Sequence, residues 1–459
     1  MADLIAAAIK HVLLNPAAFS AKVLGLPLRP YQLEAVTAII QAVIKGEGGV
    51  FTVHMARQMG KNELSAHLEA YLLVLFQRRN ARLVKTAPTY KPQIINSMER
   101  LTKTLQNPWT AGRWSKKHGY IFQVGNAEIA FLSGEPGANV VGHTANLLLE
   151  VDEAQDFDPD KYNRDFRPMA ATGNAVTVLY GTAWTSDTLL AREIEKARER
   201  GNHFEYPWHV LAELSPQYRQ FVQDERSRLG EEHPIFLTQY ALRTIDHLAR
   251  LFTPAQIQAI RTPAPPQGVP VAGLDPAGQA LAGTRQHDRT ALLLGTASTA
   301  PGGPSVTITQ ALTWQGDRHA DVMPQILQAL QAHGVATVAV DATGLGEHYA
   351  AYLQDHYGPH RVIPVRYSRP VKSQIAFALM AAAATGRLHI NVDDPTLWQE
   401  MELAQRRALP GGFMDFYVPE TLGHDDYVNA LGLTILAAQE VKPPPASATI
   451  APERRKEEF

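Results

Sequence analysis

The chain has 459 residues, 45% hydrophobic and 19% charged, a composition that can bury a sizeable core and excludes wholesale disorder. The absence of cysteine excludes a disulfide scaffold, a cysteine-ligated zinc and a thiol nucleophile. With 43 Lys and Arg against 45 Asp and Glu, a uniformly basic nucleic-acid coat is excluded, although local basic patches are not. No apolar run is long enough to span a bilayer, so we expect no membrane partner.

The N-terminal half alternates strand-like runs with helical stretches. Residues 2–23 predict one amphipathic helix, and strand-like runs follow at 50–54, 82–87, 128–132, 147–151 and 175–181. Strands separated by helical patterns favour a mainly parallel sheet covered by helices. Residues 186–261 read as charged and helical, with no strand. The segment 262–270 contains four prolines and predicts a linker.

A second alternating region follows the linker. We expect strands at 271–274, 290–294, 305–312 and 337–340, and helices at 346–354, 372–385 and 425–439. The remaining tail is rich in proline and charge, which predicts disorder. The chain as a whole therefore predicts two α/β regions.

A candidate phosphate-binding loop lies between the strand at 50–54 and the helix predicted at 63–76. It reads Met55-Ala56-Arg57-Gln58-Met59-Gly60-Lys61-Asn62. Backbone N–H groups at such a helix start can point at phosphates, and the lysine can reach the terminal ones. Met55 replaces the first glycine of the usual motif, and Asn62 replaces its Mg²⁺-binding hydroxyl. Taken alone, Gly-Lys before a helix is more often only a helix start.

Two carboxylates strengthen the nucleotide interpretation. Asp152 and Glu153 follow the apolar strand at 147–151, 91 residues after Lys61. An ATPase needs such a pair, because the Asp holds hydrated Mg²⁺ and the Glu polarises the attacking water. An acidic helix cap is the alternative. Thr182 ends the next strand, where it either senses the γ-phosphate or belongs to a plain turn.

The second region places carboxylates at corresponding positions. Asp275 and Asp341 each end a predicted strand, while Asp425 and Asp426 open the last helix. Two-metal phosphodiester cleavage requires several carboxylates that converge on two divalent ions. Singly, each residue has a simpler explanation as a turn or helix-capping acid. Asp288 and Lys372 are further candidates for this site or for the DNA backbone, although a turn or solvated position explains each of them as well.

In combination, these motifs stand in the order found in the large terminase subunits of tailed bacteriophages. The chain resembles this family over roughly residues 28–438. The motifs that carry the resemblance are Arg57-Gln58-Met59-Gly60-Lys61, Asp152-Glu153-Ala154, Tyr180-Gly181-Thr182, Leu274-Asp275, Asp341-Ala342-Thr343-Gly344-Leu345-Gly346 and His424-Asp425-Asp426-Tyr427-Val428-Asn429-Ala430.

The resemblance implies an α/β fold with two enzymatic parts. A P-loop ATPase domain with a mainly parallel sheet would occupy 1–210, and a helical lid or linker 211–262. The Pro-rich linker 263–270 would lead to an RNase H-like nuclease domain at 271–440 and a disordered tail at 441–459. The implied activity is ATP-driven translocation of viral DNA through a portal into a procapsid, with a two-metal endonuclease that cuts the concatemer.

The family's site residues transfer position by position. Lys61 would bind the terminal phosphates, and Arg57 would help to order or sense them. Asp152 would hold Mg²⁺, Glu153 would act as catalytic base, and Thr182 would couple hydrolysis to motion. The expected ATP-binding set is Gln32 (at the adenine), Arg57, Gln58, Gly60, Lys61 and Asn62. Because Asn62 lacks the hydroxyl, we expect Mg²⁺ binding to be weakened but not absent. Asp275, Asp341 and Asp425 would ligate two Mg²⁺ or Mn²⁺ ions, with Asp426 close by.

The resemblance also implies partners. These are double-stranded viral DNA, a portal protein, a small terminase subunit and further copies in a ring on the portal, with a monomer possible in solution. The expected location is the cytoplasm of the infected bacterial host, transiently at the procapsid portal and not in the mature virion. The family often places a trans-acting arginine shortly before the Asp-Glu strand. Residues 137–149 contain none, so Arg100 or Arg113 is a possible substitute.

Three alternatives remain open at this stage. A DNA repair helicase or translocase would explain Asp152-Glu153-Ala154-Gln155, although it normally needs a second motor domain. A degenerate ATPase that only scaffolds an assembly would explain Met55 and Asn62. A junction resolvase would explain the second region alone. For DNA contact, we consider two basic clusters: Arg78, Arg79, Arg82 and Lys85, or Lys116 and Lys117.

Overall fold

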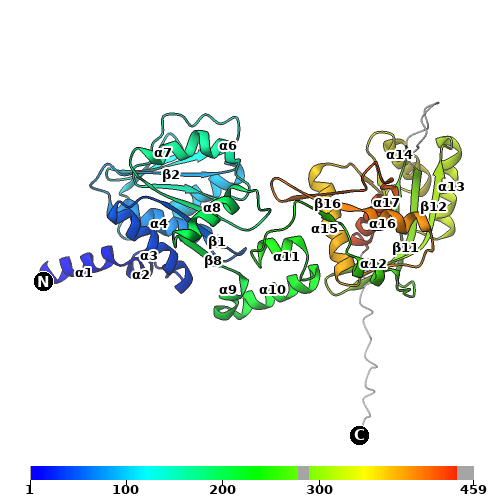
Figure 1. Ribbon diagram of the computed structural model, residues 1–459, viewed down its shortest axis with the longest axis horizontal. Coiled ribbons are helices and arrows are strands. Elements are labelled where there is room, and N and C mark those ends of the chain that lie inside the picture. Colours follow the sequence, from blue (N-terminus) through cyan, green and yellow to red (C-terminus); the bar gives the residue numbers. More distant parts are fainter. Residues whose placement is uncertain (1, 278–288, 442–459) are drawn as a thin grey trace, which may run out of the picture. The chain divides into compact units, whose positions relative to one another are not determined.

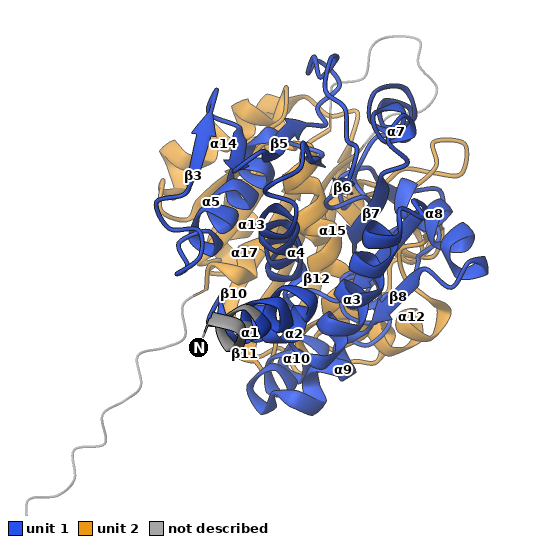
Figure 2. Cartoon of the chain, turned by 90° about the vertical axis from the view of Figure 1, so that its left-hand side faces the viewer, with its two compact units in different colours: residues 1–226, 230–248, 408–413 blue, residues 227–229, 249–407, 414–459 orange. Residues whose placement is uncertain are grey.

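The computed structural model describes residues 2–277 and 289–441, and the chain divides into two compact units (Figures 1 and 2). Unit 1 comprises residues 1–226, 230–248 and 408–413, and unit 2 comprises 227–229, 249–407 and 414–459. Asp288 and the predicted disordered tail from 442 lie outside the described residues. None of the described helices is long and apolar enough to cross a membrane.

An eight-stranded sheet forms the centre of unit 1, in the order β3-β4-β5-β2-β6-β7-β1-β8. Only the β3-β4-β5 edge is antiparallel, so the prediction of a mainly parallel sheet is confirmed. The strands are β1 (Val50–Met55), β2 (Arg82–Ala87), β3 (Trp114–Lys117), β4 (Ile121–Val124), β5 (Ala127–Ser133), β6 (Leu148–Val151), β7 (Val176–Gly181) and β8 (His203–Tyr206).

Helices cover both faces of this sheet (Figure 1). The helices up to β8 are α1 (Ala2–Leu14), α2 (Pro16–Lys22), α3 (Pro30–Lys45), α4 (Lys61–Leu75), α5 (Ile95–Thr104), α6 (Pro159–Lys161), α7 (Arg167–Ala171) and α8 (Leu189–Glu199), with π-helical turns η1 (Tyr90–Ile94) and η2 (Tyr162–Phe166). The helical segment after β8 contains α9 (Trp208–Leu214), α10 (Pro216–Leu229) and α11 (Pro234–Gln239). One core cluster includes Leu149, Val151, Phe166 and Leu179, all nearly inaccessible to solvent.

Two predictions for unit 1 are wrong. The expected single helix at 2–23 is two helices, because Pro16 cannot continue α1 and instead begins α2, which Asn15 caps by accepting a hydrogen bond from the Ala18 N–H at 3.1 Å. The segment 186–261 is not free of strands. It contains β8, which pairs with β1 at the sheet edge, and β9 (Leu248–Arg250). A short edge strand has one neighbour and needs no long apolar run, so its sequence signal is weak.

Unit 2 is built on a six-stranded sheet in the order β14-β13-β10-β11-β12-β15. Its antiparallel centre, β10-β11-β12, is flanked by parallel pairs. The strands are β10 (Val269–Asp275), β11 (Arg289–Ala300), β12 (Gly303–Gln315), β13 (Thr337–Asp341), β14 (Val362–Val365) and β15 (Leu388–Ile390). A three-stranded sheet has the order β17-β16-β9, with β16 (Gln405–Leu409) and β17 (Phe413–Tyr417).

The helices of unit 2 pack against its six-stranded sheet or against one another. They are α12 (Pro254–Arg261), α13 (His319–Ala332), α14 (Gly346–Tyr357), α15 (Arg369–Ala384), α16 (Pro395–Leu403) and α17 (Asp426–Gln439). α13 and α14 share one core cluster with the sheet, including Leu274, Val338, Ile326 and Leu353. α17 packs against β10, β11 and β13. This contact is close because Gly273 has no side chain: a Cβ there would lie 2.1 Å from the carbonyl oxygen of Ala430.

Candidate nucleotide and metal sites

The topology of unit 1 brings three motifs to one edge of its sheet. β6, β7 and β1 are consecutive parallel neighbours, so their carboxyl ends meet at the same edge. The phosphate loop follows β1, Asp152 follows β6, and Thr182 follows β7. This edge of a parallel α/β sheet is where ligands ordinarily bind.

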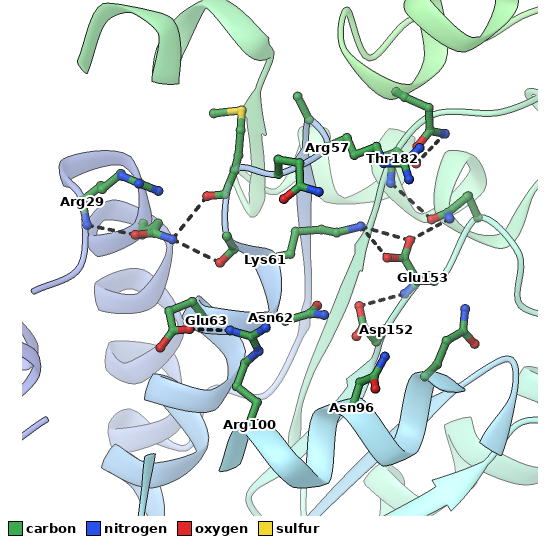
Figure 3. A pocket seen from close by; sticks show the side chains of 18 of the residues that line it. Arg29, Arg57, Lys61, Asn62, Glu63, Asn96, Arg100, Asp152, Glu153 and Thr182 are labelled. Carbon is green, nitrogen blue, oxygen red and sulfur yellow. Dashed lines mark hydrogen bonds and ion pairs between the residues drawn. The ribbon is translucent and has the colours of Figure 1, made fainter. Parts of the chain in front are cut away.

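A cavity of about 820 Å³ lies at this edge and collects the predicted nucleotide residues. All nine of them line it: Gln32, Arg57, Gln58, Gly60, Lys61, Asn62, Asp152, Glu153 and Thr182. Figure 3 labels six of these: Arg57, Lys61, Asn62, Asp152, Glu153 and Thr182. Its size is within the range of pockets that enclose small-molecule ligands. Loops and helix starts that are distant in the sequence therefore contribute to one cavity.

Lys61 and Glu153 contact each other in the cavity (Figure 3). The Lys61 Nζ lies 3.0 Å from both carboxylate oxygens of Glu153. Burial raises the pKa of Glu153, but the Lys61 ammonium and the Gln155 amide outweigh it, and the net pKa lies below the ordinary value. Glu153 therefore stays ionised, as a residue that polarises water must. Its backbone φ of 46° places it in the left-handed region, where strained residues often mark functional sites.

Oxygen donors for a Mg²⁺ ion are present in the same cavity. Asp152 is buried, and Asn62 at the start of α4 offers an amide oxygen. Burial raises the pKa of Asp152, a cost that a bound cation would relieve. Asp152 also accepts a hydrogen bond from the Glu153 N–H at 3.0 Å, which fixes the direction of one carboxylate oxygen. The chemistry of these donors fits a hydrated Mg²⁺.

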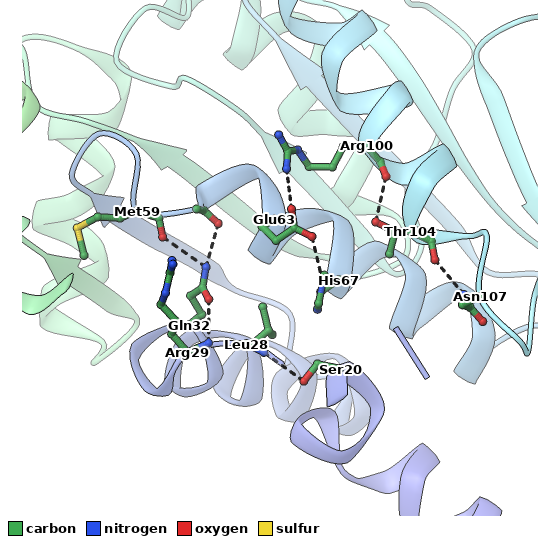
Figure 4. Close-up of polar contacts among 11 residues, drawn as sticks. Ser20, Leu28, Arg29, Gln32, Met59, Glu63, His67, Arg100, Thr104 and Asn107 are labelled. Carbon is green, nitrogen blue, oxygen red and sulfur yellow. Dashed lines mark hydrogen bonds and ion pairs between the residues drawn. The ribbon is translucent and has the colours of Figure 1, made fainter. Parts of the chain in front are cut away.

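The phosphate loop is supported by hydrogen bonds from α3 (Figure 4). Gln32 Nε2 donates to the carbonyl oxygen of Gly60 at 3.1 Å, and Tyr31 Oη donates to that of Met59 at 2.7 Å. Gly60 has a φ of 91°, and a Cβ on it would lie 2.7 Å from Gln32 Nε2. The backbone conformation therefore favours glycine, and a Cβ would also displace the Gln32 amide that supports the loop. Gln32 thus has a structural task in addition to the adenine contact predicted for it.

A chain of hydrogen bonds leads from Glu153 to the helical segment. Gln155 Nε2 donates to Glu153 Oε2 at 2.8 Å, and Gln155 Oε1 accepts from the Thr182 N–H at 3.2 Å. Gln239 of α11 then donates to Thr182 Oγ1 at 3.1 Å. The Arg57 N–H donates to the carbonyl oxygen of Gln239 at 2.8 Å. The sequence analysis did not assign Gln155 or Gln239, and only Gln155 stands beside a motif that could have indicated it.

Beneath the cavity, a buried polar network explains Glu150, which interrupts an apolar strand. Glu150 on β6 and Lys85 on β2 are direct cross-strand neighbours. Ser65 and Tyr180 each donate to Glu150 Oε1 at 2.7 Å. Lys85 Nζ lies 2.8 Å from Glu69 Oε1, and burial raises the pKa of Glu150 to about 8. The network therefore links β2, β6, β7 and α4 in a part of the core that apolar side chains would ordinarily fill.

This network corrects one DNA-binding prediction. Lys85 is 1% exposed and cannot contact DNA phosphates, because alternation along β2 points it at α4. Arg78, Arg79, Lys116 and Lys117 are exposed, so their DNA contact stays a prediction.

Arg100, considered as a trans-acting arginine, lines the cavity of its own chain. Its Nη1 lies 2.6 Å from Glu63 Oε2, and Glu63 also lies 3.2 Å from His67 (Figure 4). The His67 hydrogen bond outweighs burial and, with Arg100, lowers the pKa of Glu63. Arg113 is exposed.

The carboxylates of unit 2 also converge. β10 and β13 are parallel neighbours, so Asp275 and Asp341 end at the same sheet edge, and α17 begins there with Asp426. Burial, followed by the charges of Asp426, Asp341 and Asp425, raises the pKa of Asp275 well above its ordinary value. Several acids that repel one another in this way form the donor set that hard divalent cations prefer.

Residues 272–438 match the family model of the terminase RNaseH-like domain. This segment is therefore similar to terminase RNaseH-like domains. It contains all four candidate metal-binding aspartates, and it spans β10 to α17. No curated protein sequence matches the chain.

Solved large terminase structures share the fold of nearly the whole chain. The large terminase of a thermophilic bacteriophage matches with a TM-score of 0.56 and 12% identity, over 89% of this chain and 98% of that one. The complex of that protein with ATP-gamma-S gives a TM-score of 0.55 and 12% identity, over 90% of this chain and 99% of that one. The predicted resemblance and α/β fold class are thereby confirmed, and at this identity the likeness concerns the fold.

Within residues 272–438, the four aspartates differ in their surroundings. Asp426 Oδ2 accepts a hydrogen bond from the Arg289 N–H at 3.0 Å, so β11 holds this carboxylate. Asp425 Oδ1 accepts from Asn429 Nδ2 at 3.1 Å. Asp341 Oδ1 accepts from the Thr343 N–H at 2.8 Å. These contacts orient the carboxylates, which fits their predicted roles as metal ligands.

Three further residues of unit 2 have defined places near these aspartates. Tyr367 has a buried hydroxyl with no hydrogen-bond partner, and burial and the charges of Asp275, Asp341 and Asp425 raise its pKa. Lys372, a candidate for this site, pairs with Asp415 at 3.1 Å. Glu400 is buried, which raises its pKa to about 8, and it accepts from the Tyr427 N–H. The sequence analysis missed Tyr367 and Glu400, and no local motif marks either of them.

Proposed function

We propose that this chain is the large subunit of a bacteriophage terminase, an ATP-driven DNA-packaging motor with a fused endonuclease. One observation carries the proposal. The same chain contains Lys61 within 3.0 Å of Glu153 in a cavity lined by every predicted ATP residue, and a domain of the terminase RNaseH-like family with four candidate metal-binding aspartates. The fold of the whole chain supports it.

In unit 1, the side chains divide the work of ATP hydrolysis. Lys61 would leave Glu153 for the terminal phosphates, which frees the carboxylate to accept a proton from water. Asp152 and Asn62 would hold Mg²⁺, which neutralises developing charge. The hydrogen bonds from Glu153 through Gln155 to Thr182 supply a path by which a change at the carboxylate would reach α11.

In unit 2, Asp275, Asp341, Asp425 and Asp426 would hold two Mg²⁺ or Mn²⁺ ions. When bound, the ions would activate water and stabilise the leaving oxygen of the DNA backbone. The aspartates would hold the ions in fixed positions, because two sit at adjacent strand ends and two at the start of a helix that packs against β10. DNA cutting and ATP hydrolysis therefore belong to different units of the chain.

The proposed partners follow from this role. They are double-stranded viral DNA, a portal protein, a small terminase subunit and further copies of the chain in a ring. The motor would act in the cytoplasm of the infected bacterium, at the procapsid portal, and would not remain in the mature virion. Against a helicase, the second unit has the terminase RNaseH-like fold instead of a second motor domain. Against a scaffold, the nine nucleotide residues share one cavity.

The test is steady-state ATP hydrolysis by the purified full chain, with and without double-stranded DNA. We expect Lys61→Ala and Glu153→Gln each to lower kcat by about 100-fold or more, the range for loss of a catalytic proton acceptor or phosphate ligand. Lys45→Ala is the matched control, because Lys45 is exposed and pairs with Glu47 at the surface. Unchanged hydrolysis in Lys61→Ala, or none in the wild type with DNA present, would overturn the motor assignment.

A further inference from the structure

We propose that His54, His203 and Glu205 of unit 1 form a binding site for a divalent transition-metal ion of the Zn²⁺ class. None of the three lines the nucleotide cavity, and all lie outside the terminase RNaseH-like domain. Among residues 2–277 and 289–441, they are the one group of three His, Asp or Glu side chains whose donor atoms all lie within 4.8 Å of one another. The inference does not depend on the proposed function.

The register of two strands builds this group. β1 and β8 run parallel, with Thr52 beside His203 and His54 beside Glu205. Side chains two residues apart on a strand share a face, so all four side chains lie on the same face of the sheet. The group is therefore placed by backbone hydrogen bonds and not by a flexible loop.

The donor atoms already converge in the absence of an ion. His203 Nε2 lies 3.1 Å and His54 Nδ1 3.5 Å from the same oxygen, Glu205 Oε2. Movements of a few tenths of an ångström to about one ångström would place three donors around one ion at zinc distances of about 2.0–2.2 Å. Side-chain rotation alone can supply such shifts.

A second observation points to a ligand. His54 is 4% exposed, and neither of its ring nitrogens has a hydrogen-bond partner, since the contact of Nδ1 with Glu205 at 3.5 Å is too long for a good one. A buried polar nitrogen that lacks a partner is costly, and such groups are rare in proteins. A metal ion at the group would supply the missing partner to His54.

The second histidine is oriented as metal-binding imidazoles usually are. Thr52 Oγ1 lies 2.8 Å from His203 Nδ1. In the tautomer that donates this hydrogen bond, Nε2 is available to bind a metal, and a neighbour that fixes the ring in this way is typical of metal sites. Arg198 also contacts Glu205 Oε2 at 2.6 Å, but its side chain is 57% exposed and can turn toward solvent when a cation arrives.

The donor set selects the class of ion. Two imidazoles and one carboxylate suit Zn²⁺ or Co²⁺, whereas Mg²⁺ and Ca²⁺ prefer oxygen alone. The ion would join β8 to β1 directly before the phosphate loop. Three protein ligands leave a fourth position, which a water molecule would fill from the exposed side at Glu205.

The test is equilibrium dialysis of the full chain against Zn²⁺ alone, with Co²⁺ absorption as a second readout. The parent protein carries Asp275→Asn and Asp341→Asn, so that the carboxylates of unit 2 do not contribute. We expect one equivalent of Zn²⁺ to be lost in His203→Gln, with at least a 100-fold weaker affinity. Thr52→Val should weaken binding about 10- to 100-fold. His209→Gln, which changes an exposed histidine of α9, should bind like the parent.

Co²⁺ should give the intense visible absorption of a four-coordinate site in the parent and not in His203→Gln. Glu205→Gln is a second ligand variant that settles the question if His203→Gln fails to fold by circular dichroism. The proposal is overturned if the parent binds no Zn²⁺ at about 100 μM. It is also overturned if His203→Gln and Glu205→Gln retain the parent's stoichiometry and affinity.

Discussion

Lys85 should be essential to the stability of unit 1, although it touches no ligand. Its side chain is 2% exposed and that of Glu69 is fully buried, with 2.8 Å between Nζ and Oε1. At an effective dielectric constant of about 20, this separation corresponds to an attraction of about 6 kcal/mol, which the cost of burying both charges partly offsets. Removal of one partner leaves an unpaired buried charge. Lys85→Met should therefore lower the free energy of unfolding by about 3–5 kcal/mol.

The measurement is urea unfolding of the full chain, followed by tryptophan fluorescence. We expect the midpoint of the unit 1 transition to move down by about 1–5 M urea, given slopes of about 1–3 kcal/mol/M. The control is Lys196→Met, the same substitution in an ion pair with Glu193 that is 61% exposed at the lysine, which should cost less than about 1 kcal/mol. The double variant Lys85→Met/Glu69→Gln should recover most of the loss, because no unpaired charge remains.

The reasoning is refuted if Lys85→Met and Lys196→Met cost the same. It is also refuted if the double variant is as unstable as Lys85→Met plus the separate loss from Glu69→Gln, because the two side chains would then not interact.

Three further predictions concern the buried acid, the loop glycine and the missed glutamine. Burial raises the pKa of Glu150 to about 8 from an ordinary 4.5, so its contribution to stability is present at acidic pH and is lost as the pH rises to about 8. Glu150→Gln should remove this decline of the unfolding free energy between pH 5 and 8.5, as measured by urea titrations. Gly60→Ala should weaken binding of a fluorescent ATP analogue at least tenfold, and Gly46→Ala, also at positive φ but with no atom within 4 Å, should not. Gln239→Ala should lower ATP turnover about tenfold with a smaller change in nucleotide affinity, and an equal loss in the exposed Gln217→Ala would contradict this.

Sequence reasoning succeeded where the residues of one short segment are enough to indicate its secondary structure. The apolar runs that became β1, β2 and β13 are bounded by turns, and the polar residues that follow such runs, such as Lys61 and Asp152, stand out against them. Parallel strand ends then bring such residues together without further information.

It failed where the signal depends on a neighbour. The role of Glu150 could not be predicted from its own strand. Its partner Lys85 belongs to β2, and only the register of the two strands pairs them. The same limit hid His54 and His203, since β8 itself was missed. Gln239 lies in a helix with no motif, and only the packing of α11 beside Thr182 reveals it.

The central claim is that one chain carries separate sites for ATP hydrolysis and DNA cleavage. Plasmid cleavage with Mg²⁺ or Mn²⁺ tests it most directly, comparing the wild type with Asp341→Ala and Lys61→Ala. We predict that Asp341→Ala abolishes cleavage while Lys61→Ala, which lies in unit 1, still cuts in the absence of ATP. Cleavage that survives Asp341→Ala, or a wild type that cuts with neither metal, would contradict the account.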